Sequence, residues 1–195
     1  MGSVLLQLML IATWLAESQS PVVSFGKSAG VLIDPRGYVV TCHHCVSAHE
    51  HWLVKLRDGR CYIGQVVASD PARELALVRL DAGGRRFAWQ RLAETPARVR
   101  DEVTVIGHPK GWSWTTTVGR VTAIGREVPI DGTQVKGLMQ VDASINPGCS
   151  GGAVLNGRGE LVGVPVAMHA DALGIGFVIP VKQIQEFLGA NLPKE

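Results

Sequence analysis

Short apolar runs, separated by turns that contain glycine or proline, fill most of the chain from residue 22 onward. Runs of this kind, whether continuous or alternating with polar residues, are typical of β-strands. Eleven segments show the pattern: 30–33, 38–41, 51–56, 61–68, 75–80, 102–107, 115–125, 137–141, 153–156, 160–168 and 174–179. Turn dipeptides such as Asp131-Gly132 and Asn156-Gly157 separate several of them. Helical spacing of apolar residues is clear only near the end, at Val181, Ile184 and Phe187.

The strands form two series on either side of a stretch without clear periodicity. Many strands and one terminal helix predict an all-β fold, as a sandwich or a barrel, and two series favour two barrels. We assign residues 21–84 to an N-terminal lobe, 85–98 to a linker, 99–180 to a C-terminal lobe and 181–190 to the terminal helix. The whole of 21–195 is expected to be one domain, with an active cleft between its lobes.

Residues 1–20 form a separate apolar segment. The run from Val4 to Ala16 has the length of a signal-peptide core and precedes a passable cleavage site, but no Lys or Arg stands before it. It is shorter than the roughly 20 residues that span a bilayer. Three interpretations stay open. A signal or anchor predicts an exported, periplasmic or membrane-anchored protein, and a short helix packed on the domain predicts a cytoplasmic one. The third is a segment added by cloning.

Composition narrows the function classes. The 195 residues carry 19 basic and 17 acidic side chains, a net charge of +2, and no basic run longer than two residues. Nucleic-acid binding therefore has little electrostatic support. Four cysteines are too few for a disulfide framework in a chain of this length.

The segment 146–152, Asn-Pro-Gly-Cys-Ser-Gly-Gly, has the form of a nucleophile turn. Gly148 permits backbone conformations in which successive N–H groups point into one hollow, and such a hollow stabilises an oxyanion next to Ser150. A serine nucleophile needs a base and a group that orients the base. His44, directly after a predicted strand, is the candidate base, and Glu74, at the start of another, is the candidate acid.

With these residues in place, the sequence resembles the trypsin-like serine proteases of the HtrA/Deg type from about residue 22 to 188. The resemblance is carried by segments 30–41, 70–80, 105–109, 118–124, 140–152 and 174–180. It implies two six-stranded antiparallel β-barrels with the triad in the cleft between them. The family motif Thr-x-x-His matches Thr41 to His44, the nucleophile matches Ser150, and the oxyanion hole falls on Gly148, Cys149 and Ser150, with the N–H groups of Gly148 and Ser150 as donors.

Glu74 departs from the family pattern, which has aspartate there. The extra methylene moves the carboxylate by about one bond length, and such displacements can cost on the order of 100-fold in rate. The prediction is a slower but active serine endopeptidase that hydrolyses unfolded or exposed polypeptide. Two alternatives stay open: a catalytically inactive protease-fold protein that binds peptides or a partner, and Asp70 as the acid.

By analogy with trypsin-like folds, Ser144 and Ile145 lie at the primary specificity pocket, and the strand with Val164, Pro165 and Val166 runs beside the substrate backbone. Since no acid lies at Ser144, we predict cleavage after small or medium apolar residues. We expect no cofactor, and a homo-oligomer, by family analogy a trimer, is possible. Because the sequence stops at Glu195, soon after the terminal helix, no PDZ domain is expected in it.

Cys42 and Cys45 flank two histidines, which gives the segment the content of a metal site. A zinc site needs four suitably directed ligands, and no second pair of cysteines with this spacing occurs, so no metal is predicted. The alternatives for these cysteines are a disulfide or, as the main expectation, ordinary buried thiols.

Overall fold

The structure, a computed structural model, describes residues 20–169 and 173–194. The expected apolar segment at residues 1–20 lies, except for Ser20, outside the described residues. Within the described ranges, no helix is long and apolar enough to cross a membrane.

The first six strands close into an antiparallel barrel in the order β1-β2-β3-β6-β5-β4. They are β1 (Val22–Phe25), β2 (Ser28–Asp34), β3 (Tyr38–Cys42), β4 (His51–Lys55), β5 (Cys61–Asp70) and β6 (Leu75–Leu80). Strands β2, β3 and β6 are almost wholly buried, while β4 and β5 alternate between buried or half-buried and exposed positions. The alternation follows from the two-residue period of a strand, whose successive side chains point to opposite faces.

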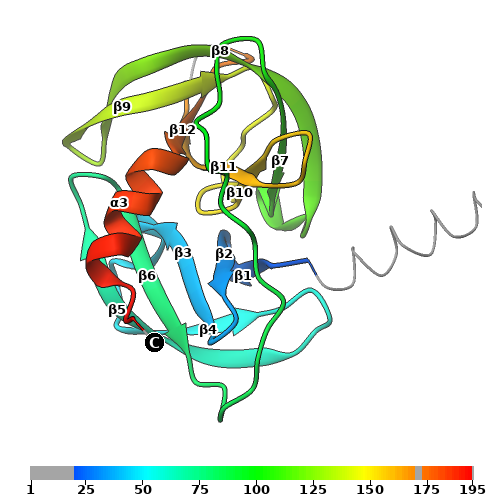
Figure 1. Ribbon diagram of the computed structural model, residues 1–195, viewed down its shortest axis with the longest axis vertical. Coiled ribbons are helices and arrows are strands. Elements are labelled where there is room, and N and C mark those ends of the chain that lie inside the picture. The colour runs from blue at the N-terminus through cyan, green and yellow to red at the C-terminus, as the bar shows by residue number, and fades with distance from the viewer. Residues whose placement is uncertain (1–19, 170–172, 195) are drawn as a thin grey trace, which may run out of the picture.

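A second antiparallel barrel follows in the order β10-β11-β12-β9-β8-β7. Its strands are β7 (Glu102–Gly107), β8 (Thr115–Ile130), β9 (Thr133–Val141), β10 (Ala153–Leu155), β11 (Leu161–Met168) and β12 (Gly176–Pro180). The 3-10 helix η1 (Pro109–Gly111) lies between β7 and β8. Figure 1 shows the two barrels one above the other, with the blue and cyan strands below the green, yellow and orange ones.

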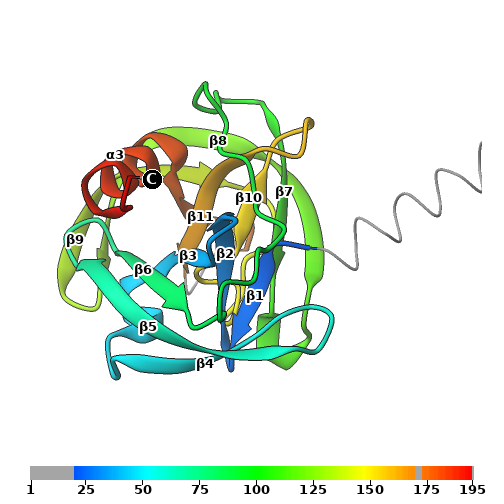
Figure 2. The same cartoon turned by 60° about the horizontal axis from the view of Figure 1, so that its bottom comes forward.

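The segment between β6 and β7 is hydrogen-bonded to both barrels as it passes from one to the other (Figures 1 and 2). The Gln90 N–H donates to the Leu32 carbonyl of the first barrel at 2.7 Å. The Leu161 N–H of the second barrel donates to the Arg91 carbonyl at 2.8 Å. The linker, which lacks periodicity in sequence, is thus fixed by backbone pairing with strands on either side.

Helix α3 (Val181–Asn191) contacts β6 of the first barrel and β11 and β12 of the second. Its buried side chains are Val181, Ile184, Phe187 and Leu188, which the helical period places on one stripe. One hydrophobic core accordingly runs from the first barrel into the second and under the helix. The burial of apolar surface by both barrels and α3 holds the two barrels at a fixed relative geometry.

The predicted all-β fold of two six-stranded antiparallel barrels with a C-terminal helix is confirmed. Three local features differ from the sequence prediction. Strand β1 was not named, the strands around Asp131-Gly132 are longer than expected, and the four-residue helix α2 (His43–Val46) was missed. Such a short helix has no room for a recognisable period.

Substitution of Gly30 tests the packing of the first barrel. A Cβ at Gly30 would lie 2.6 Å from Val39 Cγ1 and in contact with Phe25 Cε2. We expect Gly30→Ala to lower the free energy of unfolding by about 1–3 kcal/mol, as overpacked cores do. Gly157→Ala is the control, because nothing lies within 4 Å of that position. Equal unfolding midpoints for the two variants in urea would contradict this packing.

Candidate active site

Ser150 lies in a tight turn between β9 and β10 that is pressed against the first barrel. The Ala29 N–H of β2 donates to the Ser150 carbonyl at 3.0 Å, and the Gly151 N–H donates to the Pro165 carbonyl at 2.9 Å. Gly151 has a φ of +82°, and a Cβ there would overlap the Ala29 carbonyl and the Thr41 hydroxyl. Glycine is therefore required at Gly151, where the turn meets the first barrel.

Gly148 shapes the hollow in front of Ser150. Its φ is +102°, and a Cβ at this position would overlap the His108 carbonyl. The Cys149 N–H is used inside the turn, where it donates to the Asn146 carbonyl at 2.9 Å. Over residues 20–169 and 173–194, no hydrogen bond involves the N–H groups of Gly148 or Ser150. These two donors are the ones that the sequence assigned to an oxyanion hole.

His44 is held by Glu74. It belongs to α2, the single helical turn that directly follows β3, and its Nδ1 lies 2.7 Å from Glu74 Oε2. The His44 side chain is 26% exposed, whereas that of Glu74 is 3% exposed. The buried carboxylate fixes the ring and favours the tautomer with hydrogen on Nδ1, which leaves the lone pair on Nε2.

The backbone brings the Glu74 carboxylate to His44. Glu74 has a left-handed φ of +58°, a conformation that costs a non-glycine residue roughly 1–2 kcal/mol. Its carbonyl accepts the His43 N–H at 3.0 Å, which joins the turn before β6 to α2. Asp70 caps this same turn, with its carboxylate bonded to Ala72 and Arg73. The structure thus brings Glu74, and not Asp70, to the histidine.

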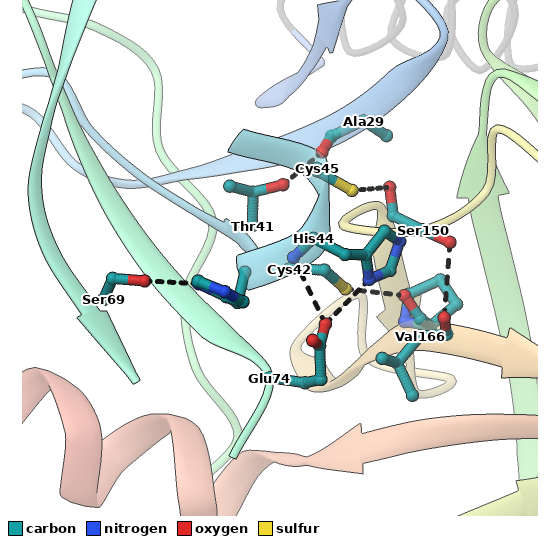
Figure 3. A network of polar contacts seen from close by, with 11 residues as sticks. Ala29, Thr41, Cys42, His44, Cys45, Ser69, Glu74, Ser150 and Val166 are labelled. Carbon is teal, nitrogen blue, oxygen red and sulfur yellow. Dashed lines mark hydrogen bonds and ion pairs between the residues drawn. The ribbon is translucent and has the colours of Figure 1, made fainter. Parts of the chain in front are cut away.

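The Ser150 hydroxyl donates to the Val166 carbonyl at 3.4 Å. No hydrogen bond between Ser150 Oγ and His44 is present in the described structure. Figure 3 shows His44 among Glu74, Cys45 and Ser150, at the junction of the two barrels. The three predicted triad residues therefore share one cluster, in which the acid–base contact is formed and the serine hydroxyl is turned to β11.

Two buried thiols complete this cluster. Cys42 Sγ donates to the Pro165 carbonyl at 3.3 Å, and Cys45 Sγ to the Ser150 carbonyl at 3.6 Å. Cys149 is buried as well, Cys61 is exposed, and all four cysteines are free. The disulfide alternative is therefore wrong for this structure, and the expectation of buried thiols holds for Cys42 and Cys45.

The Cys45 thiol and Glu74 change the acid–base properties of His44. The neighbouring Cys45 sulfur is the largest cause, and the Glu74 carboxylate the next, that raises the pKa of His44 from 6.5 to about 10. Hydrogen bonding to Cys42 is the main cause that lowers the pKa of Cys45, and His44 adds to it. Burial raises the pKa of Cys42. The contacts in this cluster thus shift the two groups in opposite directions: the pKa of His44 rises and the pKa of Cys45 falls.

The residues expected to bind substrate lie on both sides of Ser150. Ser144 and Ile145 line a cavity of about 80 Å³, together with Met168 and Gly174. The side chains of Val164 and Val166 are buried in the core, so any substrate contact of these two residues runs through their backbone. A β-bulge lies between Pro165 and Ala167, and the Pro165 carbonyl is already bonded to Cys42 and Gly151. Of the three predicted strand residues, Val166 presents its carbonyl to the nucleophile.

Comparisons with known proteins identify the family and agree with the fold. The family described as a trypsin-like peptidase domain matches residues 28–164. The chain belongs to this family. Among curated proteins, HhoA of Synechocystis sp. is 39% identical over 172 residues, which cover 85% of this chain and 44% of HhoA. The periplasmic serine endoprotease DegP of Escherichia coli is 37% identical over 161 residues, 80% of this chain and 34% of DegP.

A solved structure of the HtrA-type protease AlgW with a decapeptide superposes with a TM-score of 0.77 at 34% identity, covering 84% of this chain and 50% of that one. The trypsin-like domain described here is thus of the HtrA type, as the sequence indicated. The chain spans less than half the length of these two curated relatives.

Sequence reasoning missed three groups of this trypsin-like site. The first is the Val166 carbonyl, which accepts a hydrogen bond from the Ser150 hydroxyl. The second is the Thr41 hydroxyl, which donates to the carbonyl of Ala29, a residue bonded to the Ser150 turn. The third is Cys45, which donates to the Ser150 carbonyl and influences His44. The two Cys residues that flank the histidines were the available signal for Cys45. No comparable signal exists for a backbone carbonyl, whose direction depends on strand register.

The contact between Glu74 and His44 predicts the effect of shortening the Glu74 side chain. Since Glu74 Oε2 already lies 2.7 Å from His44 Nδ1, aspartate would withdraw the carboxylate by about 1.5 Å. We expect Glu74→Asp to lower kcat/KM by about 100-fold and Glu74→Gln to lower it by about 10⁴-fold. Peptide hydrolysis by purified variants with matched thermal stability measures both. Faster hydrolysis by Glu74→Asp would show that the glutamate is misplaced.

Cys45 gives a pH-dependent prediction. A general base must be neutral, so a His44 with a raised pKa confines activity to alkaline pH. Cys45→Ser removes the largest cause of the shift, so the acidic limb of kcat/KM is expected to move to lower pH by about one unit or more. Cys61→Ser, at an exposed position, is the control. An acidic limb at the same pH in all three proteins would exclude this influence of Cys45.

Proposed function

We propose that this domain is a serine endopeptidase that cleaves unfolded or exposed polypeptide. The most direct support is the contact between the buried Glu74 carboxylate and His44 Nδ1 at 2.7 Å. This pair belongs to the same cluster as the Ser150 turn. A carboxylate, an imidazole and a serine at the junction of two barrels are the components of acyl transfer. Family membership and the names of the relatives agree with this reaction class.

In the proposed mechanism, the Ser150 hydroxyl leaves the Val166 carbonyl and turns to His44. His44 Nε2 takes the hydroxyl proton while Oγ bonds to the scissile carbonyl carbon. Glu74 accepts the hydrogen bond from Nδ1 and stabilises the imidazolium, which then protonates the leaving amine. The N–H groups of Gly148 and Ser150 stabilise the oxyanion, and water releases the acyl group by the reverse sequence.

A fluorophosphonate probe tests the nucleophile without knowledge of the substrate. We expect one covalent adduct on Ser150, located by mass spectrometry, and none in Ser150→Ala. Ser47→Ala should label like the unchanged chain, because Ser47 is exposed and outside the cluster. Absence of an adduct on folded protein, tested up to alkaline pH, would reject the enzyme and favour an inactive protein that binds peptides or a partner.

The small cavity lined by Ser144 and Ile145 favours cleavage after small or medium apolar residues. Its volume of about 80 Å³ suits a short aliphatic side chain and is lined by Ile145 and Met168, with Ser144 where a basic side chain would need an acid. Mapping cleavage sites in a denatured protein mixture should show Ala, Val or Ile before the cut. Ser144→Asp should raise cleavage after Lys or Arg by at least about tenfold. Predominant cleavage after Lys or Arg by the unchanged chain would contradict this assignment.

Location and assembly remain proposals. DegP is named as a periplasmic protease, and this similarity supports an extracytoplasmic location for the present chain. A homo-oligomer, by family analogy a trimer, stays a prediction.

A further inference from the structure

The Cys42–His44–Cys45 segment concentrates three metal-binding side chains at the active centre. A ring nitrogen of His44 and the two sulfur atoms all lie within 4.8 Å of one another. Within residues 20–169 and 173–194, no other group of three or more cysteine, histidine or acidic side chains has its ligand atoms gathered in this way. The cluster results from the junction of β3 with α2, where Cys42 and Cys45 are both buried.

The spacing of these atoms is close to that of a zinc site. Zinc binds thiolate sulfur at about 2.3 Å and imidazole nitrogen at about 2.0–2.1 Å, so tetrahedral ligands lie roughly 3.5–3.8 Å apart. The observed limit of 4.8 Å requires a contraction of roughly 1.0–1.3 Å at most. On binding zinc, the thiols would give up their contacts to the Pro165 and Ser150 carbonyls, at 3.3 and 3.6 Å.

Glu74 supplies the second layer that zinc-binding histidines require. It accepts the hydrogen of His44 Nδ1 at 2.7 Å, and the remaining lone pair, on Nε2, is directed away from the carboxylate. A carboxylate that orients a histidine in this way also orients it as a metal ligand. The two neighbouring thiols supply the soft ligands that favour zinc.

We propose that Cys42, His44 and Cys45 form an inhibitory zinc site, with the fourth coordination position open to water. Binding releases one proton from each thiol: Zn²⁺ joins two thiolate sulfurs and one neutral imidazole, and two protons pass to solvent. No oxidation or reduction takes place. Zinc enters from the His44 side, because the His44 side chain is partly exposed whereas Cys42 is wholly buried.

The inhibition follows from competition for one lone pair. The Nε2 atom that would bind zinc is the atom that takes the proton of Ser150 in the proposed mechanism. The inhibitory effect, although not the binding, rests on the proposed peptidase function. Zinc would keep the peptidase inactive until the metal is removed.

Binding is tested on the Ser150→Ala chain, reduced and freed of metal, so that the result does not depend on peptidase activity. Calorimetric titration with ZnCl₂ should show one site, and CoCl₂ should give a thiolate-to-cobalt absorption band. Cys42→Ser and Cys45→Ser, each in the Ser150→Ala chain, should weaken zinc binding at least about 100-fold, and Glu74→Gln about 10- to 100-fold. Cys61→Ser is the matched control and should bind zinc unchanged, because Cys61 lies outside the cluster and is exposed.

Inhibition is then measured on the chain with Ser150 intact. Zinc should abolish peptide hydrolysis and EDTA should restore it, and Cys42→Ser should need at least about 100-fold more zinc for half-inhibition, relative to its own zinc-free rate. No binding, no cobalt–thiolate band, or equal affinity in the folded cysteine variants would overturn the site. Tight binding with undiminished hydrolysis would overturn the inhibition. Cysteine-dependent binding to a chain that hydrolyses nothing would support the site and reject the peptidase function instead.

Discussion

The hydrogen bond between His44 and Glu74 is the interaction on which the proposed site depends. It links α2 to the turn before β6, and it fixes which nitrogen of His44 carries the lone pair. The strained backbone at Glu74 persists because its carbonyl is bonded to His43 and its carboxylate to His44. Strain of this kind, when over-determined by its surroundings, is a feature of functional sites.

The second requirement is the fixed placement of one barrel on the other. His44 and Glu74 belong to the first barrel and Ser150 to the second, so the site exists only at their junction. Bonds from Ala29 to Ser150 and from Cys42 to Pro165 cross this junction, and Gly151 allows the turn to approach the first barrel closely. The shared core and α3 supply the apolar burial that maintains these polar contacts.

Much of the fold was predictable because strand periodicity and turn residues are local properties of the sequence. The family motifs around His44 and Ser150 also identified the candidate base and nucleophile. The geometry of Glu74 was not predictable, because the residue type does not reveal the left-handed backbone from which its carboxylate reaches His44. The approach of Cys45 to His44 likewise depends on the inward turn of α2, which is too short to have a sequence signature.

His44 thus contacts a carboxylate that orients it as a base. It also lies beside two thiols, of which Cys45 raises its pKa, and with which it could bind a metal. The central claim is that Glu74 orients this ring. Proton NMR of reduced, zinc-free protein with ¹⁵N-labelled histidine tests it through the Nδ1–H signal of His44. We predict a strongly downfield signal, protected from exchange, that moves upfield or disappears in Glu74→Gln. An unchanged signal in folded Glu74→Gln, or no such signal in the unchanged chain, would contradict the account.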